Sequence, residues 1–504
     1  MLYHPRDKGL WDAWVFHHEG TFHLFHLQLI DRERYWWHIA HATSPDLLRW
    51  TEQEPALTAG AEGEWDHGTL GTGSTFAANG RFYLTYCRLG PGRPQQIGIA
   101  SSDDLYHWTK ASENPILEPA MESGTYETDL EQKSDRAPSC RDAFVRHDAA
   151  DGAYHALFAA RVAEGPTVRR GCVGHAVSGD LVHWELRPPI YAPGLFHDHE
   201  VPQLHRIGNR YYLIWMMFDI YGNHHEIPSR RFASGTFYAV SDKPYEGFSS
   251  PADNLLIGSG NGRWDLASTS VLPLGDELLL TYHMCGRGLP DYVSLAAPKL
   301  LEATDDGELV ARYCPRVDAL KTGELVGGLR SQWVEAKRCL PGENWSLRDD
   351  VLTAEVDGSF TLGTGIGATH FLLECELLIE TGRFAGIGIT EEGGELSAAA
   401  AGTLLSAVDA GAVLDAEAQE VHVLGFTGAK TGPVLRPLDS AGFCVRARAW
   451  HHLRMMVRRP WTDIFFDDCL VFSLALPWPE KGQFVFLACD GTIRFRNFIV
   501  HEIE

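Results

Sequence analysis

The sequence lacks several features that would assign it to a common class. Its 504 residues contain no run of 18 apolar residues, and residues 1–7 include no apolar segment of the kind that directs secretion. There is no Cys-x-x-Cys pair, because the ten cysteines are scattered from Cys87 to Cys489. We therefore expect no disulfide framework, no metal, no cofactor and no membrane segment. A reduced, cytoplasmic location is the matching expectation.

Positive charge is also scarce. Lysine and arginine total 43 against 67 aspartate and glutamate residues, which gives a formal net charge of −24. An acidic surface repels phosphate backbones and anionic lipids, so nucleic-acid and membrane partners are disfavoured. Aromatic residues, by contrast, are plentiful, with 15 tryptophans and 16 tyrosines whose rings suit both β-rich cores and the faces of a small carbohydrate.

Helical periodicity is hard to find before Pro315, where short β-branched and aromatic runs alternate with turn signals. Five glycine-containing pairs each lie between two such runs: Glu19-Gly20, Asn79-Gly80, Asp151-Gly152, Gly208-Asn209 and Gly275-Asp276. This is the pattern of tight two-residue hairpin turns that need a positive φ. The five hairpins predict five successive β units.

A short motif, Ser-x-Asp-Leu-x-x-Trp, repeats through the same region. It occupies 44–50, 102–108 and 178–184, and a degraded copy begins at Ser241, so the serines are 58, 76 and 63 residues apart. These intervals are too long for helical solenoid repeats and fit four-stranded propeller blades with loop insertions. We expect the Ser and Asp side chains to accept hydrogen bonds from nearby backbone N–H groups, so the motif marks blades rather than chemistry.

Acidic residues occupy comparable places in three of the five units. Asp12 lies 8 residues before the glycine of the following turn, Asp142 lies 10 before it and Glu200 lies 8 before it. A lone aspartate there could simply cap a strand. The first strand of each blade lines the channel of a propeller, however, so the three carboxylates are expected to converge at one mouth. Convergence raises the pKa of at least one carboxyl and supplies an acid and a base.

Other stretches offer possible substrate contacts. The second unit has only small residues around Ser74, which would leave room for a ligand. In the fifth unit Trp264 could form a wall and Asp265 could bond hydroxyls, with a structural role as an equal alternative. The run His-Asp-His-Glu at 197–200 has the letters of a metal site, but a glutamate flanked by hydrogen-bonding residues explains it without a metal.

The blade pattern stops after Pro315. Residues 321–335 are typical of a linker, and residues 336–504 show evenly spaced alternating strands that predict a β-sandwich. The expected fold is therefore all-β: a five-bladed β-propeller catalytic domain over 1–320, a linker over 321–335 and a C-terminal, concanavalin-like β-sandwich over 336–504.

These motifs resemble glycoside hydrolase family 32, the β-fructosidases, in the clan of five-bladed propeller glycosidases that also holds families 43, 62 and 68. Residues 41–50 are similar to the family's His-Ala-x-Ser-x-Asp-Leu-x-x-Trp, 141–143 to its Arg-Asp-Pro and 200–204 to its Glu-Cys-Pro-Asp-Leu. Ala143 and Val201 depart from the last two motifs. The Trp-Asp-Ala-Trp of 11–14 is nearer to the Trp-Asp-Ser-Trp of the family 68 levansucrases.

The resemblance implies a role for each carboxylate. Asp12 would be the nucleophile, Glu200 the acid/base and Asp142 the transition-state stabiliser. The expected substrate-binding residues are Arg141, Trp11, Trp14, Ser74, Trp264 and Asp265. The implied function is that of a retaining β-fructofuranosidase-like hydrolase, exo-acting on sucrose or short fructo-oligosaccharides. An inverting family 43-like arabinofuranosidase or xylosidase and a non-catalytic sugar-binding propeller stay open as alternatives.

Overall fold

The computed structural model describes residues 3–5, 9–31, 33–34, 36–90, 94–118, 124–128, 138–217, 234–259, 266–286, 289–332, 338–339, 344–355, 358–365, 368–391, 408–425, 438–476 and 478–504. The chain forms two compact units, and the division between them falls between Cys314 and Pro315. The boundary predicted at residue 320 lies at the end of the 3₁₀ helix Pro315–Leu320, which opens the second unit.

The first unit consists of five antiparallel sheets that follow one another along the chain. The first two sheets are formed by β1 (Leu10–His18), β2 (Thr21–Asp31), β3 (Trp36–Ser44) and β4 (Thr51–Glu52), and by β5 (Thr69–Gly71), β6 (Thr75–Ala78), β7 (Arg81–Leu89), β8 (Gln96–Ser102) and β9 (Thr109–Lys110). The next two are formed by β10 (Cys140–Asp148), β11 (Ala153–Arg161), β12 (Gly171–Ser178) and β13 (Trp184–Tyr191), and by β14 (Glu200–Ile207), β15 (Arg210–Met217), β16 (Ser234–Ser241) and β17 (Leu255–Ser259). The fifth contains β18 (Leu266–Leu274), β19 (Glu277–Gly286), β20 (Leu289–Leu295), β21 (Lys299–Ala303) and β22 (Leu309–Tyr313).

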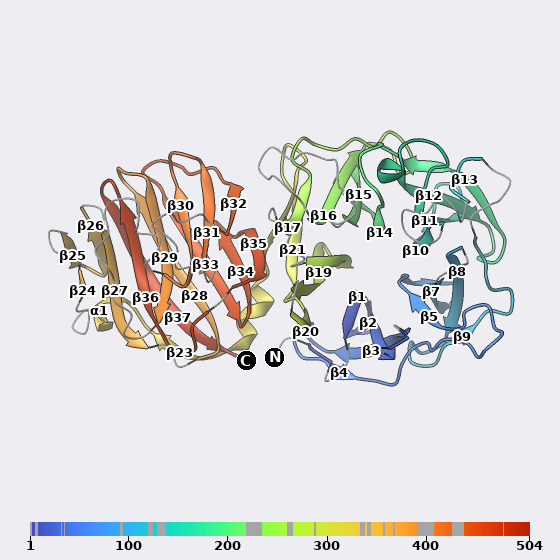
Figure 1. Cartoon of the computed structure of the whole chain (residues 1–504), viewed down its shortest axis with the longest axis horizontal. Coiled ribbons are helices and arrows are strands. Elements are labelled where there is room, and N and C mark those ends of the chain that lie inside the picture. Colours follow the sequence, from blue (N-terminus) through green and yellow to red (C-terminus); the bar gives the residue numbers. More distant parts are fainter. Residues whose placement is uncertain are drawn as a thin grey trace. The chain divides into compact units, whose positions relative to one another are not determined.

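The five sheets are arranged around a common centre (Figure 1). Their inner strands contact one another in a closed sequence, β1 with β6, β6 with β10, β10 with β14, β14 with β18, and β18 with β1. The ring therefore closes at its inner strands, as in a β-propeller. The predicted propeller fold is confirmed, with one sheet for each predicted hairpin unit.

Each sheet contains a hairpin at the place where the sequence predicts one. His18 pairs with Thr21 across Glu19-Gly20, where both turn residues have a positive φ, of 46° and 80°. The third hairpin differs from the prediction, because Asp148 pairs with Ala153 and the turn therefore has four residues instead of two.

The repeated Ser-x-Asp-Leu-x-x-Trp motif closes the turn after the third strand of three blades. In the first copy, Ser44 Oγ accepts hydrogen bonds from Asp46 N at 3.1 Å and Leu47 N at 2.9 Å. Asp46 Oδ1 accepts from Leu48 N at 2.9 Å and Arg49 N at 2.8 Å. The other two copies repeat all four bonds. These bonds hold the buried Leu47 at a φ of 67°, which is uncommon for leucine, and they confirm the structural role predicted for the motif.

Side-chain hydrogen bonds tie the inner strands of neighbouring blades together. Trp14 Nε1 donates to Thr75 Oγ1 at 3.0 Å, Ser74 Oγ donates to Ala143 O at 2.8 Å, Asp142 Oδ2 accepts from Val201 N at 3.2 Å, Gln203 Oε1 accepts from Val271 N at 3.0 Å and Ser270 Oγ accepts from Val15 N at 3.3 Å. Each blade is thereby fixed to both neighbours. The centre of the ring is consequently a rigid place to mount functional groups.

The second unit contains two antiparallel sheets, which confirms the predicted β-sandwich. One sheet has the strand order β35-β34-β33-β28-β37-β26-β25, with β23 also paired to β37, and the other has the order β24-β27-β36-β29-β30-β31-β32. The elements are β23 (Lys321–Val326), α1 (Leu329–Gln332), β24 (Arg338–Cys339), β25 (Trp345–Arg348), β26 (Val351–Ala354), β27 (Gly358–Gly365), β28 (His370–Ile379), β29 (Phe384–Glu391), β30 (Ala410–Asp415), β31 (Glu420–Gly425), β32 (Asp439–Gly442), β33 (Trp450–Arg458), β34 (Trp461–Phe466), β35 (Cys469–Ala475), β36 (Gly482–Cys489) and β37 (Ile493–Ile503). Buried side chains of both sheets, such as Phe371 and Phe486, share one apolar core.

The predicted linker over 321–335 is wrong in its first part. Residues 321–326 form β23, in which Lys321 pairs with Ile503 of β37, and α1 follows directly. The partner strand lies at the far end of the chain, so no local pattern in the sequence reveals this pairing. Residues 333–335 lie outside the described residues.

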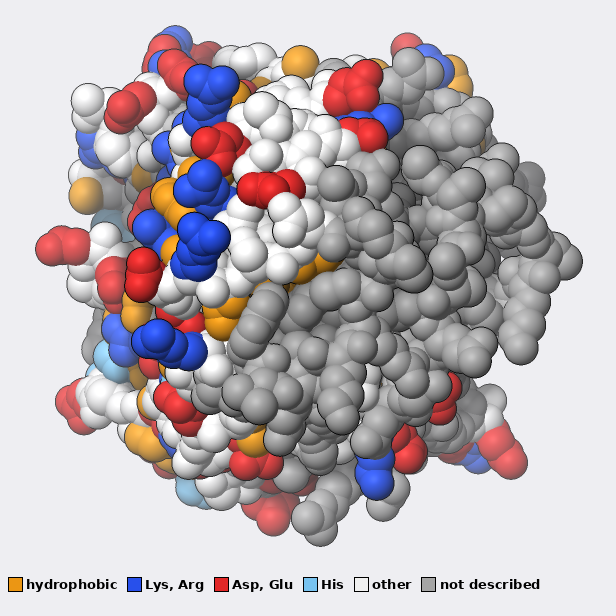
Figure 2. Space-filling model, turned by 90° about the vertical axis from the view of Figure 1, so that its left-hand side faces the viewer, with side chains coloured by type: hydrophobic (Ala, Val, Ile, Leu, Met, Phe, Trp, Pro, Cys, Tyr) orange, Lys and Arg blue, Asp and Glu red, His pale blue; other side chains and the backbone are white. Residues whose placement is uncertain are grey.

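Charged side chains of the second unit form pairs across neighbouring strands. Arg454 Nε lies 2.9 Å from Glu374, and Arg496 Nη2 lies 2.6 Å from Glu376. On the face of this unit that Figure 2 shows, acidic and basic side chains are intermixed. Within the described parts of the chain, the helices fall short of the length and apolarity that a membrane crossing requires.

Candidate active site

Three inner strands carry a bulge where the predicted catalytic residues lie. The pairing register with the next strand shifts between Trp11 and Ala13 in β1, between Arg141 and Phe144 in β10, and between Glu200 and Gln203 in β14. A bulge leaves extra residues unpaired and re-aims their side chains. At the bulges, the side chains of these residues therefore depart from the regular alternation between the two faces of the sheet.

The backbone at these bulges is strained. Asp12 has a φ of 34°, Asp142 a φ of 59° and Val201 a φ of 48°. Non-glycine residues in this region cost about 1–3 kcal/mol each and persist only where the surroundings fix them. Such strain is typical of functional sites, and here it falls on or beside each of the three predicted catalytic residues.

The expectation that all three carboxylates occupy equivalent places needs a correction. Val201, and not Glu200, shares the positive-φ bulge position of Asp12 and Asp142, so Glu200 corresponds to Arg141. Counting from the turn glycine hid this shift, because glycine is second in Glu19-Gly20 but first in Gly208-Asn209. Glu200 therefore reaches the site from one residue earlier in its strand.

Arg141 joins the carboxylates of the third and fourth blades. Its Nη2 donates to Glu200 Oε1 at 2.8 Å, and its Nε lies 3.3 Å from Asp142 Oδ2. The same oxygen of Asp142 accepts a hydrogen bond from Val201 N at 3.2 Å. Asp142 is 5% exposed and the Glu200 side chain 14%, so these charges interact in a largely water-excluded place.

Asp12 completes the group from the first blade. The hydroxyl of Thr72, which lies between β5 and β6, donates a hydrogen bond to Asp12 Oδ2. Asp12 is also close enough to Asp142 for its negative charge to raise the pKa of that residue. The structure therefore brings the three predicted catalytic residues together, and Thr72 is a contact that sequence reasoning missed because a lone threonine carries no signal.

The environment of Asp142 changes its acidity. Burial raises the pKa of Asp142 to about 7; Arg141 opposes the increase, and the charge of Asp12 adds to it. Near neutral pH this carboxyl can therefore either donate a hydrogen bond to a sugar hydroxyl or accept one.

Asp198 is a further acidic member of the group. It is fully buried, its Oδ2 lies 3.5 Å from Arg141 Nη2, and it accepts a hydrogen bond from His197 Nδ1 at 3.0 Å. The sequence drew attention to 197–200 only as a possible metal site. No group of three or more His, Cys, Asp or Glu side chains in the described ranges could hold a metal ion. Asp198 lies two residues before Glu200, and this close pair of acidic residues was the signal from which a network of charges could have been predicted.

The predicted substrate-binding residues are placed differently from one another. The indole of Trp14 is buried and bonded to Thr75, and the hydroxyl of Ser74 is bonded to Ala143 O, so both serve to join blades. Trp11 is half-buried beside Asp12, with its ring centroid 4.7 Å from that of His283. Trp264 and Asp265 lie outside the described residues. Sugar binding by these residues stays a prediction.

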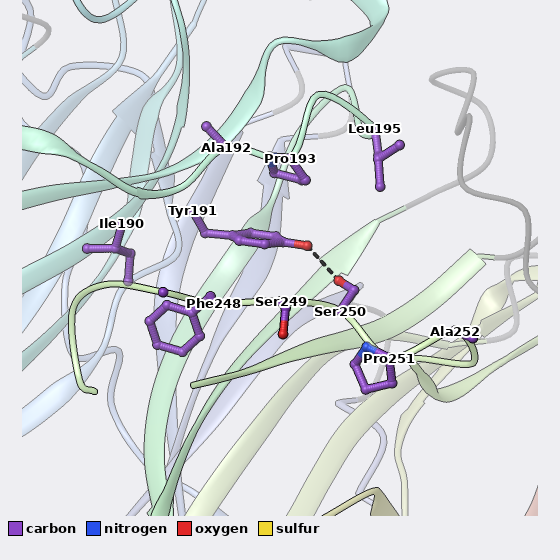
Figure 3. Close-up of a pocket in the computed structure, with 11 residues that line it drawn as sticks. Ile190, Tyr191, Ala192, Pro193, Leu195, Phe248, Ser249, Ser250, Pro251 and Ala252 are labelled. Atoms are coloured by element: carbon purple, nitrogen blue, oxygen red, sulfur yellow. Dashed lines mark hydrogen bonds between the residues drawn. The ribbon is translucent and has the colours of Figure 1, made fainter. Parts of the chain in front are cut away.

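A separate pocket of about 600 Å³ lies between the end of β13 and the loop before β17. Its lining residues are Ile190, Tyr191, Ala192, Pro193, Leu195, Gly247, Phe248, Ser249, Ser250, Pro251 and Ala252 (Figure 3). Tyr191 OH and Ser250 Oγ, 2.6 Å apart, are hydrogen-bonded. This lining contains no carboxylate and none of the predicted site residues, so the pocket is distinct from the carboxylate group.

Comparison with known proteins gives a family match for part of the chain and solved structures with a similar fold. Residues 13–130 match the family model described as the glycosyl hydrolases family 32 N-terminal domain. This part of the chain is similar to glycoside hydrolase family 32. A curated relative, the insoluble isoenzyme of β-fructofuranosidase from Arabidopsis thaliana, is 26% identical over 178 residues, which are 34% of this chain. The matched part of the chain spans 28% of the length of that relative.

Solved structures match the chain over its whole length. Sucrose-6-phosphate hydrolase from Lactobacillus gasseri is 17% identical, with a TM-score of 0.68 over 100% of this chain and 92% of that one. A variant of fructan 1-exohydrolase IIa from Cichorium intybus in complex with 1-kestose is 12% identical, with a TM-score of 0.66 over 100% and 97%. At these identities the similarity shows a shared fold.

Proposed function

We propose that the protein is a retaining glycoside hydrolase, a β-fructofuranosidase that is exo-acting on sucrose or short fructo-oligosaccharides. The observation that carries this proposal is the meeting of three carboxylates on three inner strands: Arg141 contacts Asp142 and Glu200, and Asp12 lies close enough to Asp142 to influence its charge. The family 32 match over residues 13–130 and the names of the related proteins support a fructoside as the substrate.

In the first step, the carboxylate of Asp12 attacks the anomeric carbon of the fructosyl unit. Glu200 donates its proton to the glycosidic oxygen as the bond to the leaving group breaks. The products are a fructosyl ester on Asp12, an ionised Glu200 and a free leaving group. The hydrogen bond from Thr72 fixes the orientation of the attacking carboxylate.

In the second step, Glu200 acts as the base. It removes a proton from a water molecule, which attacks the anomeric carbon of the ester and releases fructose and the carboxylate of Asp12. Asp142 and Arg141 hold sugar hydroxyls during both steps, since they are nearly buried and fixed by each other and by Val201.

The proposal is tested by incubating the purified protein with sucrose, 1-kestose and short inulin and levan oligomers, beside aryl arabinofuranosides and xylosides. We expect fructose release by the wild type and its loss in Glu200→Gln. The β anomer should appear first by NMR, because double displacement retains configuration. Asp415→Asn, in the second unit, is the control and should stay active. Cleavage of only the arabinofuranosides or xylosides would favour a family 43-like enzyme, and no cleavage at all would favour a sugar-binding propeller.

A further inference from the structure

Arg141 creates a conflict for the residue proposed as the acid. Its Nη2 lies 2.8 Å from Glu200 Oε1, and a guanidinium this close favours the ionised form of a carboxyl. To protonate a leaving group, Glu200 must instead hold its proton when the substrate binds. An ion pair between these two residues alone would oppose catalysis.

Asp198 is in a position to relieve this conflict. Its Oδ2 lies 3.5 Å from the same Nη2 of Arg141 that bonds Glu200. Arg141 Nε faces a further carboxylate, Asp142, at 3.3 Å. One positive charge is therefore divided among three acids, and Glu200 receives only part of it.

The position of Asp198 is fixed by the protein and does not depend on a substrate. Asp198 accepts hydrogen bonds from His197 Nδ1 at 3.0 Å and from Ser139 Oγ at 3.4 Å. Arg161 Nη1 donates to the backbone oxygen of His197 at 2.6 Å, and Arg161 Nε is itself bonded to Glu127 at 2.7 Å. These buried contacts hold the segment that precedes β14 against the third blade.

Asp198 also keeps its charge. Burial raises the pKa of Asp198, but Arg141 and the hydrogen bond from His197 outweigh burial and hold it below its usual range. A fixed negative charge therefore stands beside Arg141 at any pH near neutrality.

We propose that Asp198 is a positioning residue that shares the charge of Arg141 with Glu200 and so allows Glu200 to stay protonated at the pH of the reaction. The inference rests on the proposed function, from which the role of Glu200 is taken. Asp198 acts through Arg141 and has no contact with the sugar in this account. The other titratable or charged groups around this network, among the described residues, are Asp12, Cys87, Glu127, Cys140, Asp142, Arg161, Cys172, His197 and His199.

The test is the pH profile of kcat/KM for Asp198→Asn. Loss of this charge leaves Arg141 to stabilise ionised Glu200, so Glu200 loses its proton at a lower pH. We expect the alkaline limb of the profile to move to a lower pH by roughly one unit. At a pH above this limb kcat/KM should therefore be about tenfold lower than in the wild type, and at a pH below it kcat/KM should change little. Asp198→Glu should restore the limb of the wild type.

Asp415→Asn is the matched control. Asp415 is also fully buried, and it is bonded to an arginine, Arg383, at 2.9 Å and to a histidine, His422, at 3.2 Å in the second unit. Asp415→Asn therefore makes the same chemical change at an equally buried carboxylate, whose partner Arg383 is partly exposed, and the pH profile of its activity should match that of the wild type. Unmoved limbs in Asp198→Asn, or a shift to higher pH, would overturn the proposal.

The inference can fail separately from the proposed function. If the wild type cleaves no fructoside, the proposed function fails, but a ¹³C NMR titration of the glutamate carboxyls still measures Glu200, whose signal is assigned with Glu200→Gln. Asp198→Asn should lower the midpoint of the Glu200 titration by roughly one pH unit. If Asp198→Asn does not fold, Ser139→Ala removes a hydrogen bond from Asp198 at 3.4 Å and one from Arg141 at 3.0 Å, so it loosens the contact between these two residues and should give a smaller shift in the same direction. An unchanged Glu200 titration in the folded variant would overturn the inference.

Discussion

Two clusters of arginine, histidine and carboxylate, each built around a buried aspartate, differ in how their charges balance. In the second unit, Asp415 accepts from Arg383 and His422, and its Oδ1 also accepts from the backbone of Glu417 and Ala418 at 3.0 Å each. That carboxylate is matched by a cation and saturated with hydrogen bonds, as a structural ion pair must be. In the first unit, one arginine faces three carboxylates. Matched buried charge thus accompanies structure, and excess negative charge accompanies the candidate site.

Backbone strain follows the same division. In the first unit, Asp12, Asp142 and Val201 adopt a positive φ inside inner strands. In the second unit, residues with a positive φ, such as Asp349 and Asp467, lie in the turns between strands, with the exception of Asn497 in β37. Turns accommodate this conformation cheaply, whereas strands do not. The strained inner strands therefore point to function and the strained turns do not.

The largest effect is expected from removing the acid at the centre of the propeller. Glu200→Gln keeps the shape of the side chain but has no proton to donate, so turnover on sucrose should fall about 10²–10⁴-fold. The melting temperature should change little, because the amide still accepts a hydrogen bond from Arg141. A variant that unfolds together with its loss of activity would make Glu200 a structural residue.

In the sandwich, the largest expected loss is one of stability. Phe486 is fully buried, with its ring centroid 5.0 Å from that of Phe495 and 5.1 Å from that of Phe498. Phe486→Ala should reduce the free energy of unfolding by about 3–5 kcal/mol, as measured by urea denaturation. An unchanged unfolding midpoint would show that this core does not stabilise the protein.

A smaller effect, an increase in stability, is expected from the substitution of Asp142. Its folded pKa, about 7, lies above its ordinary value, so its contribution to stability is complete below about pH 4 and is lost as the pH rises through 7. Asp142→Asn cannot ionise and should exceed the wild type in stability at pH 8 by about 2–4 kcal/mol, with a difference that shrinks towards pH 4. Urea denaturation across this range measures it. A variant that is less stable by a constant amount at every pH would contradict the pKa assigned to Asp142.

The smallest effect is expected from the same chemical change on the outer face of the sandwich. Glu376 is bonded to Arg496 Nε at 2.8 Å and Nη2 at 2.6 Å, and both side chains are partly exposed. Glu376→Gln should cost about 0.2–1 kcal/mol, because exposed ion pairs contribute little, and the pH profile of activity should not move. A loss of activity as large as that of Glu200→Gln would erase the distinction between the two units.

Sequence patterns predicted the features whose causes are local. The turn motif of Ser44 was predictable because all four of its hydrogen bonds span two or three residues. The hairpins were predictable from their glycines, and the convergence of the three acids followed from the repeat of the blades. Such agreement between local sequence signals and the overall fold is typical of natural sequences, in which local conformational preferences favour the same structure as the tertiary contacts.

Features that depend on packing between distant segments were not predictable. The offset between Glu200 and Val201 is set by a bulge, and bulges leave no signature in the sequence of β14. The blade-joining roles of Trp14 and Ser74 need partners on a neighbouring strand or a neighbouring blade. The same is true of β23, whose partner β37 closes the chain.

The most direct test of the central claim, that inner-strand carboxylates perform a two-step hydrolysis, is the turnover of Asp12→Asn on sucrose. The amide preserves the shape of the side chain but cannot form the fructosyl ester, so turnover should fall by roughly 10³-fold or more. The fold should survive, with a melting temperature no lower than that of the wild type, because one of several crowded negative charges is gone. Asp415→Asn should show the reverse, with full turnover and a lower melting temperature. Near-normal turnover in a folded Asp12→Asn protein would contradict the account.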